Sequence, residues 1–294
     1  MTNSRFLPFI AVGGGAMLWG AWWIPLRALE ARGLSADWAT FATSLCALAL
    51  LLPLALAKRH RLRQNAPALL AMALAAGSSF VSFNHAVVYG EIVRVTLLFY
   101  LVPVWASVLG TAFLGERLGL FRVLSILLGI AGAATVLGYG QGVPMPRTFP
   151  EWLGLASGFL WAVSLTLFRR ATEIPAVDKS IANFAGSAFM GLVFALVLSK
   201  TATPAAGFDL PGVAVLLAIS AVWLSPMVVV ELWGASRLDP GRSAVLLLLE
   251  VAVAGITATL LAGEGFGWGE AVGAALIISA GLVELRDHAR EPAT

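Results

Sequence analysis

The sequence predicts an all-α integral membrane protein with ten transmembrane helices, built as two five-helix inverted-topology repeats. Its composition is the first reason: 59% of the 294 residues are hydrophobic and only 12% are charged, about half the charged fraction of soluble domains. The second reason is that the apolar residues fall into ten runs, each bounded by charged or Pro- and Gly-rich breaks. The third is that one 23-residue segment occurs twice, once in each half.

Each half contains five apolar runs that we predict to be membrane-spanning helices. Those of the first half are 7–28, 34–57, 67–88, 92–114 and 120–138. Those of the second half are 152–168, 180–198, 211–233, 243–262 and 268–285. The first run lacks a clear small-x-small cleavage site and is followed by further runs. We therefore expect it to be the first helix and not a signal peptide.

The longest break, 141–150, holds three prolines and lies at the centre of the chain. It is predicted to link two domains, 1–140 and 151–286, with a cytoplasmic tail at 287–294. With the N-terminus in the cytoplasm, 14 of the 19 Lys and Arg residues fall on the cytoplasmic side, as the positive-inside rule favours. Both termini are then cytoplasmic. An odd number of helices per half inverts the second repeat, an arrangement that many secondary transporters use.

The repeated segment covers 94–116 and 242–264, an offset of 148 residues. Each copy opens with Arg, continues as an apolar run and closes with Gly-Glu. Near the middle, the second copy has Glu250 where the first has Val102. Glu250 lies eight residues into its predicted helix, roughly 12 Å from the helix end. A carboxyl group at that depth is costly and usually functional. We predict that Glu250 carries a proton or pairs with a substrate ammonium; a carboxyl group needed only for packing is the alternative.

Three further polar residues are candidates for the same cavity. His85, beside Asn84, is the only histidine inside a predicted helix, and it can titrate near neutral pH. It is therefore a second candidate for coupling transport to protons. Glu231 lies near the inner end of its predicted helix, with Arg237 as a candidate ion-pair partner. For all of these, ordinary hydrogen bonding at a helix end is the alternative.

Arg94 and Arg242 occupy equivalent places in the two copies, one on each side of the membrane in an inverted topology. This symmetry predicts a pair of gates, in which each Arg holds a carboxylate when its side is closed. Interfacial anchoring by snorkelling is the alternative. Glu116 and Glu264, in the Gly-Glu ends of the two copies, are expected to be structural.

The aromatic residues form a set, because ten Trp is a large number for this length. Three of them stand at spacing i, i+3 and i+4, which is one face of a helix. Aromatic rings can wall an amphipathic substrate by stacking and by cation–π contact. The predicted cavity lining is Trp19, Trp22, Trp23, Tyr100, Trp105 and Trp161. The alternative for each Trp is the aromatic belt at the membrane interface.

Several classes of function are excluded. A net charge of +3 and a pI of 9.4 do not indicate a nucleic-acid partner, because the basic residues are scattered at the ends of apolar runs. A single cysteine, Cys46, permits no intramolecular disulfide and indicates no metal cluster. The sequence has no Walker loop, HExxH motif or paired-Cys ligand set. We therefore expect no cofactor, no metal and no enzymatic activity.

Together these features resemble a known family. Ten helices in two halves, a Trp in the opening helix of each half, helices that end in Gly-Glu and the stretch FYLVPVW at 99–105 resemble the EamA-type domain pair of the drug/metabolite transporter superfamily. The resemblance implies a bacterial inner-membrane carrier that works by alternating access. It also implies a central cavity formed by the first, third, fourth, sixth, eighth and ninth helices. Its best-known bacterial members export amino acids, related metabolites or toxic organic compounds.

We therefore predict a secondary transporter that exports amino acids or related amphipathic metabolites. The expected partners are a small-molecule substrate, the lipid bilayer and protons, and the expected assembly is a monomer or weak dimer. An uptake permease or a facilitator for another metabolite class is the first alternative. An intramembrane transferase acting on lipid-linked substrates is the second; only Glu231 with Arg237 and Asp239 comes close to the acidic or His-containing cluster it would need.

Overall fold

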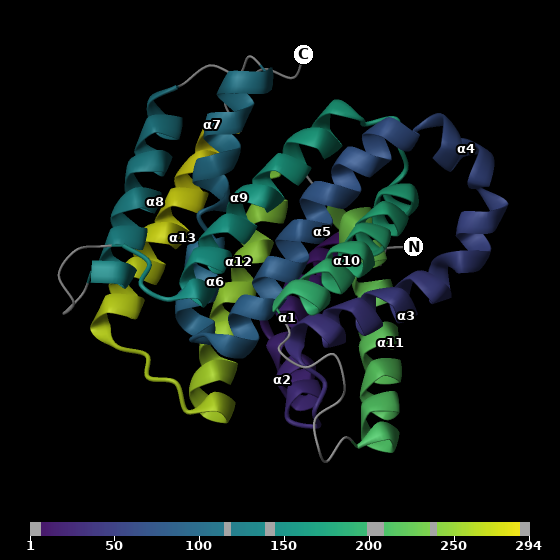
Figure 1. Cartoon of the computed structure of the whole chain (residues 1–294). Coiled ribbons are helices and arrows are strands. Elements are labelled where there is room, and N and C mark those ends of the chain that lie inside the picture. The colour runs from purple at the N-terminus through teal and green to yellow at the C-terminus, as the bar shows by residue number, and fades with distance from the viewer. Residues whose placement is uncertain (1–6, 115–118, 139–144, 199–208, 236–239, 289–294) are drawn as a thin grey trace.

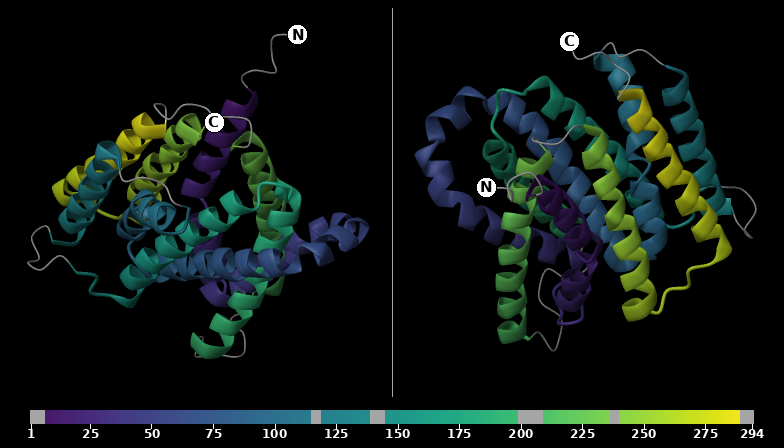
Figure 2. Two further views of the ribbon diagram at one scale, coloured as in Figure 1. Left: turned by 90° about the horizontal axis from the view of Figure 1, so that it is seen from above. Right: turned by 180° about the vertical axis from the view of Figure 1, so that it is seen from behind.

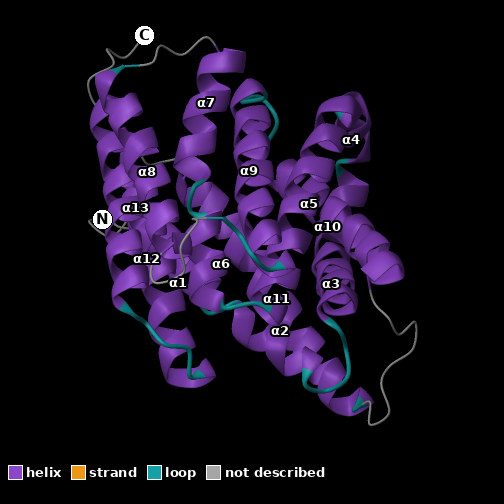
Figure 3. Ribbon diagram, turned by 60° about the vertical axis from the view of Figure 1, so that its left-hand side comes forward, coloured by secondary structure: helices purple, strands orange, loops and turns teal. Residues whose placement is uncertain are grey.

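The computed structural model describes residues 7–114, 119–138, 145–198, 209–235 and 240–288. The described ranges are helical and contain no strand (Figures 1 and 3). The helices of the first half are α1 (Leu7–Gly20), α2 (Trp23–Glu30), α3 (Ala36–Ala57), α4 (Arg59–Gln64), α5 (Ala66–Tyr89), α6 (Ile92–Phe99), α7 (Val102–Leu114) and α8 (Leu120–Gly138). Those of the second half are α9 (Phe149–Arg170), α10 (Ala176–Leu198), α11 (Leu210–Ala235), α12 (Pro240–Thr257), the π-helical turn η1 (Ala258–Ala262) and α13 (Trp268–His288).

Every predicted run coincides with one of these helices or with two consecutive ones. Within the described ranges, six helical segments are long and apolar enough to cross a membrane: 36–57, 66–89, 92–113, 149–170, 176–198 and 210–231. Shorter apolar helices cover 126–136, 249–262 and 268–280. The number of ten spans, the inverted repeat and the cytoplasmic termini stay predictions.

Two runs that we predicted as single helices are broken. The run at 7–28 is interrupted between α1 and α2, where the Trp22 N–H bonds the carbonyl three residues back. The run at 92–114 is interrupted between α6 and α7, at Tyr100 and Leu101. Each break lies close to the position four residues before a proline, Pro25 or Pro103. Proline has no N–H to donate to the carbonyl four residues before it, so one hydrogen bond of the helix is missing at that point.

The most extensive helix packing joins the two predicted halves. Helix α1 packs against α11 and α12, and α5 packs against α9 and α10. Helix α8 packs against α13 (Figure 2). Two glycines permit the closest approaches. A Cβ at Gly186 of α10 would overlap the backbone of Ala73 of α5, and one at Gly20 would lie 2.6 Å from the Glu250 carbonyl. Small residues let membrane helices pack closely, and at Gly20 this brings α1 against the helix that carries Glu250.

Candidate functional site

Glu250 is buried in the middle of the helix bundle and is hydrogen-bonded to a residue of the first half. Only 7% of the Glu250 surface is exposed. The Tyr100 hydroxyl lies 2.6 Å from Glu250 Oε2 and 2.9 Å from the Leu247 carbonyl. Since a hydroxyl has one proton, it donates to one of these acceptors at a time. Tyr100 sits at the break between α6 and α7, so the break presents this hydroxyl to the carboxyl group.

A small cavity lies directly beside Glu250. Its walls include Trp19, Trp23, Phe83 and Thr96, which come from α1, α2, α5 and α6, together with Glu250 of α12. The cavity volume is about 10 Å³, which is room for about one water molecule. The structure therefore encloses the predicted central site on all these sides, and a larger solute would need the helices to separate.

The three neighbouring Trp residues are brought together, but each has a different partner. The Trp19 indole N–H donates to Glu231 Oε2 at 2.7 Å. Trp22 is fully buried and donates to Asn84 Oδ1 at 3.1 Å. Trp23 donates to the Thr257 hydroxyl at 3.1 Å. Trp19 and Trp23 line the cavity. Trp22 and Asn84 do not line it and form a separate buried hydrogen-bonded pair.

Other predicted lining residues lie elsewhere. Trp105 packs edge-on against Phe159, and Trp161 packs edge-on against Phe168; neither borders the cavity beside Glu250. Among the predicted candidates, the structure therefore gathers Trp19, Trp23 and Glu250 around the cavity. Tyr100 is attached to this group through Glu250, and Glu231 through Trp19.

His85 has its own buried partner. Its Nδ1 lies 2.8 Å from Asp37 Oδ1, and its ring packs edge-on against Tyr89 and Phe149. Asp37 is 2% exposed and His85 is 9% exposed, so this is a second buried ionisable site. Sequence analysis did not select Asp37, although an acidic residue in the first turn of an apolar helix was a usable signal. Coupling through His85 stays a prediction.

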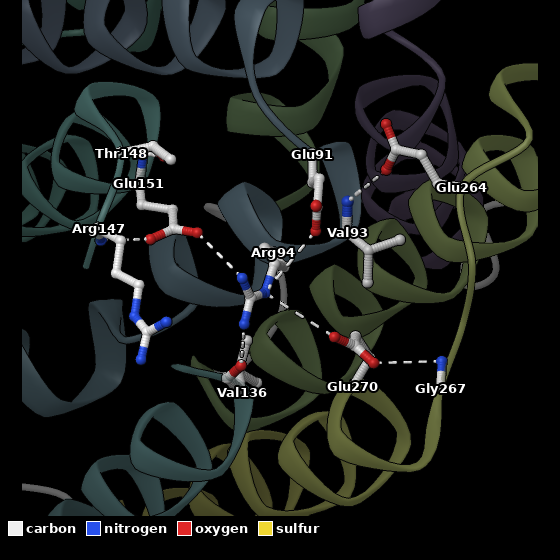
Figure 4. A network of polar contacts seen from close by, with 10 residues as sticks. All are labelled: Glu91, Val93, Arg94, Val136, Arg147, Thr148, Glu151, Glu264, Gly267 and Glu270. Atoms are coloured by element: carbon white, nitrogen blue, oxygen red, sulfur yellow. Dashed lines mark hydrogen bonds and ion pairs between the residues drawn. The ribbon is translucent and has the colours of Figure 1, made fainter. Parts of the chain in front are cut away.

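Arg94 is the centre of a polar network at the end of the molecule where α6 and α13 begin (Figure 4). Its guanidinium donates to Glu151 Oε1 at 3.1 Å and to the Val136 carbonyl at 2.7 Å. Its Nε lies 3.7 Å from Glu91 and 3.8 Å from Glu270. Arg94 and Glu151 are both less than 9% exposed, so this ion pair is far more enclosed than an interfacial anchor. It joins α6 of the first half to α9 of the second.

A second Arg at the same end makes a similar connection. Arg27 donates to the Val87 and Gly90 carbonyls and lies 3.2 Å from Glu264 Oε1. The other oxygen of Glu264 accepts the Val93 N–H at 3.2 Å. The Gly-Glu end of the second copy therefore ties α2 to α6, and Arg27 extends the connection to α5. The Gly-Glu end of the first copy, with Glu116, lies outside the described residues, as do Arg237, Asp239 and the side chain of Arg242.

The opposite end of the molecule has a different ion pair. The guanidinium of Arg61 in α4 binds Asp178 of α10 through two hydrogen bonds of 2.5 and 2.7 Å. Hydrogen bonding to Asp178 raises the pKa of Arg61 above its ordinary value. Asp178 is fully buried, so this pair anchors the first half to the second at the α4 end.

Comparisons with known proteins agree with this description. Residues 8–138 match the sequence model of the EamA-like transporter family, a family of the drug/metabolite transporter superfamily. No curated protein matches the chain. Among 16 chains of solved structures that match, one crystal structure of a protein is 17% identical and covers 98% of both chains with a TM-score of 0.65. That likeness shows a shared fold. The family match and the six apolar helices support a multi-pass membrane protein and suggest a transporter of small solutes.

Proposed function

We propose that this chain is a secondary transporter of the bacterial inner membrane that exports amino acids or related amphipathic metabolites by alternating access. One observation carries the proposal: Glu250, hydrogen-bonded to Tyr100, borders a small cavity lined by both predicted halves. A buried carboxyl group inside a membrane protein is usually part of a substrate or ion path. The match to the EamA-like transporter family over residues 8–138 supports the same function.

In this proposal, the end that holds Arg94 and Arg27 is the closed, outer side. Four of the acidic and carbonyl partners of these two residues belong to other segments, namely α5, α8, α9 and the segment after η1. Because the pairs join the two halves, separating the halves at this end requires breaking them. The repeat makes Arg242 the corresponding gate on the cytoplasmic side.

Glu250 is the proposed coupling group. It can hold either a proton or the ammonium of a substrate, and exchange between the two states would link solute movement to proton movement. Tyr100 orients the carboxyl group, while Trp19 and Trp23 offer ring faces to a cation. His85, paired with Asp37, is the second proposed coupling group.

Counterflow in proteoliposomes with a panel of labelled amino acids tests this function. We expect the native protein to exchange at least one of them and to respond to an imposed pH gradient, and we expect Glu250→Gln to lose that response. Glu173→Gln, at an exposed loop position, is the matched control and keeps both properties. Equal transport by the native protein and Glu250→Gln would indicate a facilitator. Absence of exchange across the whole panel would refute the amino-acid assignment.

A further inference from the structure

A wide apolar groove lies between α1 and α11, separate from the cavity beside Glu250. Its volume is about 1110 Å³, slightly above the range of about 300–1,000 Å³ for small-molecule sites. Its walls include Leu7, Ile10, Leu18, Ile219 and Val222, and each of these side chains is exposed. In a membrane-spanning chain, exposed apolar side chains face lipid. The groove is therefore open to the bilayer and suited to the apolar part of a molecule.

A carboxyl group stands beside this apolar groove. Gly15 lines the groove, and a Cβ built on it would lie 3.0 Å from Glu231 Oε2. Val230 and Trp233, on either side of Glu231 in α11, also line the groove. Oε2 of Glu231 accepts the Trp19 N–H, and among the described residues Oε1 has no hydrogen-bond partner and no basic side chain is paired with the carboxylate. Glu231 itself is not among the residues that line the groove, so its carboxyl group adjoins the apolar wall at Gly15.

Trp19 connects this carboxyl group to the central site. Its N–H binds Glu231 at 2.7 Å, and its ring lines the small cavity beside Glu250. Along α1, Gly14, Gly15 and Leu18 border the groove and Trp19 and Gly20 border the cavity. Trp19 therefore contacts both the carboxyl group beside the groove and the cavity beside Glu250.

We propose that the α1–α11 groove is a lateral binding site for amphipathic ammonium compounds, with the alkyl or aryl part in the groove and the ammonium at Glu231. This rests on the proposed transport function, for which the groove is the route from the lipid to Glu250. The complementarity is of two kinds. The apolar wall favours a hydrocarbon chain, and the carboxylate favours a single positive charge over a neutral or zwitterionic head group.

The test is equilibrium binding of radiolabelled n-octylammonium to the full chain in lipid nanodiscs, with empty nanodiscs subtracted. The native protein should bind n-octylammonium at least tenfold more tightly than 1-octanol, which has the same chain without the charge. Glu231→Gln should weaken n-octylammonium binding about tenfold or more, as expected for loss of a charge-assisted hydrogen bond. Gly14→Trp should weaken it similarly, because a Cβ at Gly14 points into open space in the groove. Ala131→Trp, at an exposed position of α8, is the matched control and should bind like the native protein.

Two results would overturn the site. One is equal affinity of the native protein for n-octylammonium and 1-octanol, a measurement that needs no variant to fold. The other is equal n-octylammonium binding by the native protein, Glu231→Gln and Gly14→Trp. Solute counterflow measured on the same preparations separates the two proposals. Counterflow without n-octylammonium binding removes the groove site and keeps the transporter, whereas binding that depends on Glu231 without counterflow keeps the site and removes the transport function.

Discussion

The ion pair between Arg94 and Glu151 should be one of the strongest couplings between the two halves. Both side chains are 9% exposed. Glu151 has a second donor, the Arg147 N–H at 2.7 Å, and Arg94 keeps the Val136 carbonyl. Replacing Arg94 by Gln leaves Glu151 as a buried carboxylate without its cation. Removing one partner of a buried pair typically destabilises a protein by about 3–5 kcal/mol.

Glu151→Gln should be less harmful, because Arg94 still has the Val136 carbonyl and the acidic groups of Glu91 and Glu270 within 3.8 Å. We expect a loss of about 1–3 kcal/mol for this variant. In Arg94→Gln/Glu151→Gln no buried charge is left alone, so the double variant should lose less than the sum of the single ones. The expected coupling energy is about 2 kcal/mol, within the range for residues in one network.

The assay is reversible SDS unfolding in mixed micelles for the native protein, both single variants and the double variant. An exposed pair provides the control cycle: Arg32 and Asp209 are 3.6 Å apart with side chains 42% and 49% exposed. Pairs of that kind are worth about 0–1 kcal/mol, so Arg32→Gln and Asp209→Asn should be nearly additive. A coupling energy for Arg94 and Glu151 no larger than that of the control cycle would refute the argument that this pair holds the halves together.

Three shorter predictions concern other contacts. Tyr100→Phe removes the hydroxyl that bonds Glu250 and should reduce solute exchange about tenfold, whereas Thr135→Val, which removes a hydroxyl bonded to the Ala131 carbonyl of its own helix, should leave exchange near native. Gly186→Val should abolish folded protein in size-exclusion chromatography, because even a Cβ there would overlap the α5 backbone. Asp178→Asn should lower the thermal unfolding temperature, because the fully buried side chain loses its charge-assisted bonds to Arg61, and a temperature equal to that of the native protein would contradict this.

The sequence was sufficient to locate the helices because their signal is local. Apolar runs of about twenty residues are visible without knowing any neighbour, and every predicted run is helical in the described ranges. Glu250 could be selected for the same reason, since one carboxyl group stands out in an apolar run. Its partner Tyr100 lies 150 residues away, and only the packing of α12 against α6 brings the two together.

The partners of Arg94 could not be predicted from the sequence. Glu151 and Glu270 each stand in the first turn of their helices, where acidic residues are common because they favour the positive end of the helix dipole. Sequence position alone therefore gave no reason to assign them to Arg94. What distinguishes them is that α9 and α13 both begin beside the start of α6 (Figure 4), and this follows from packing between halves.

The two helix breaks explain why the candidate site lies where it does. In an unbroken α6–α7 helix, the carbonyl four residues before Pro103 would lack its donor, so the chain turns at Tyr100 and Leu101. That turn brings the Tyr100 hydroxyl to Glu250. In the same way, the interruption before Pro25 separates α1 from α2. Trp19 therefore lies in the last turn of α1 and Trp23 begins α2, and both line the cavity. In a single straight helix, the directions of these side chains would be fixed by the regular rotation of about 100° per residue. The prolines therefore position the cavity wall through the two helix breaks.

Restoring an N–H with Pro25→Ala should straighten the α1–α2 junction and move Trp23 away from Thr257. Loss of this contact can be followed as a change in Trp fluorescence that Thr257→Val reproduces. Thr135→Val, whose hydroxyl bonds the Ala131 carbonyl of its own helix, should leave the fluorescence unchanged.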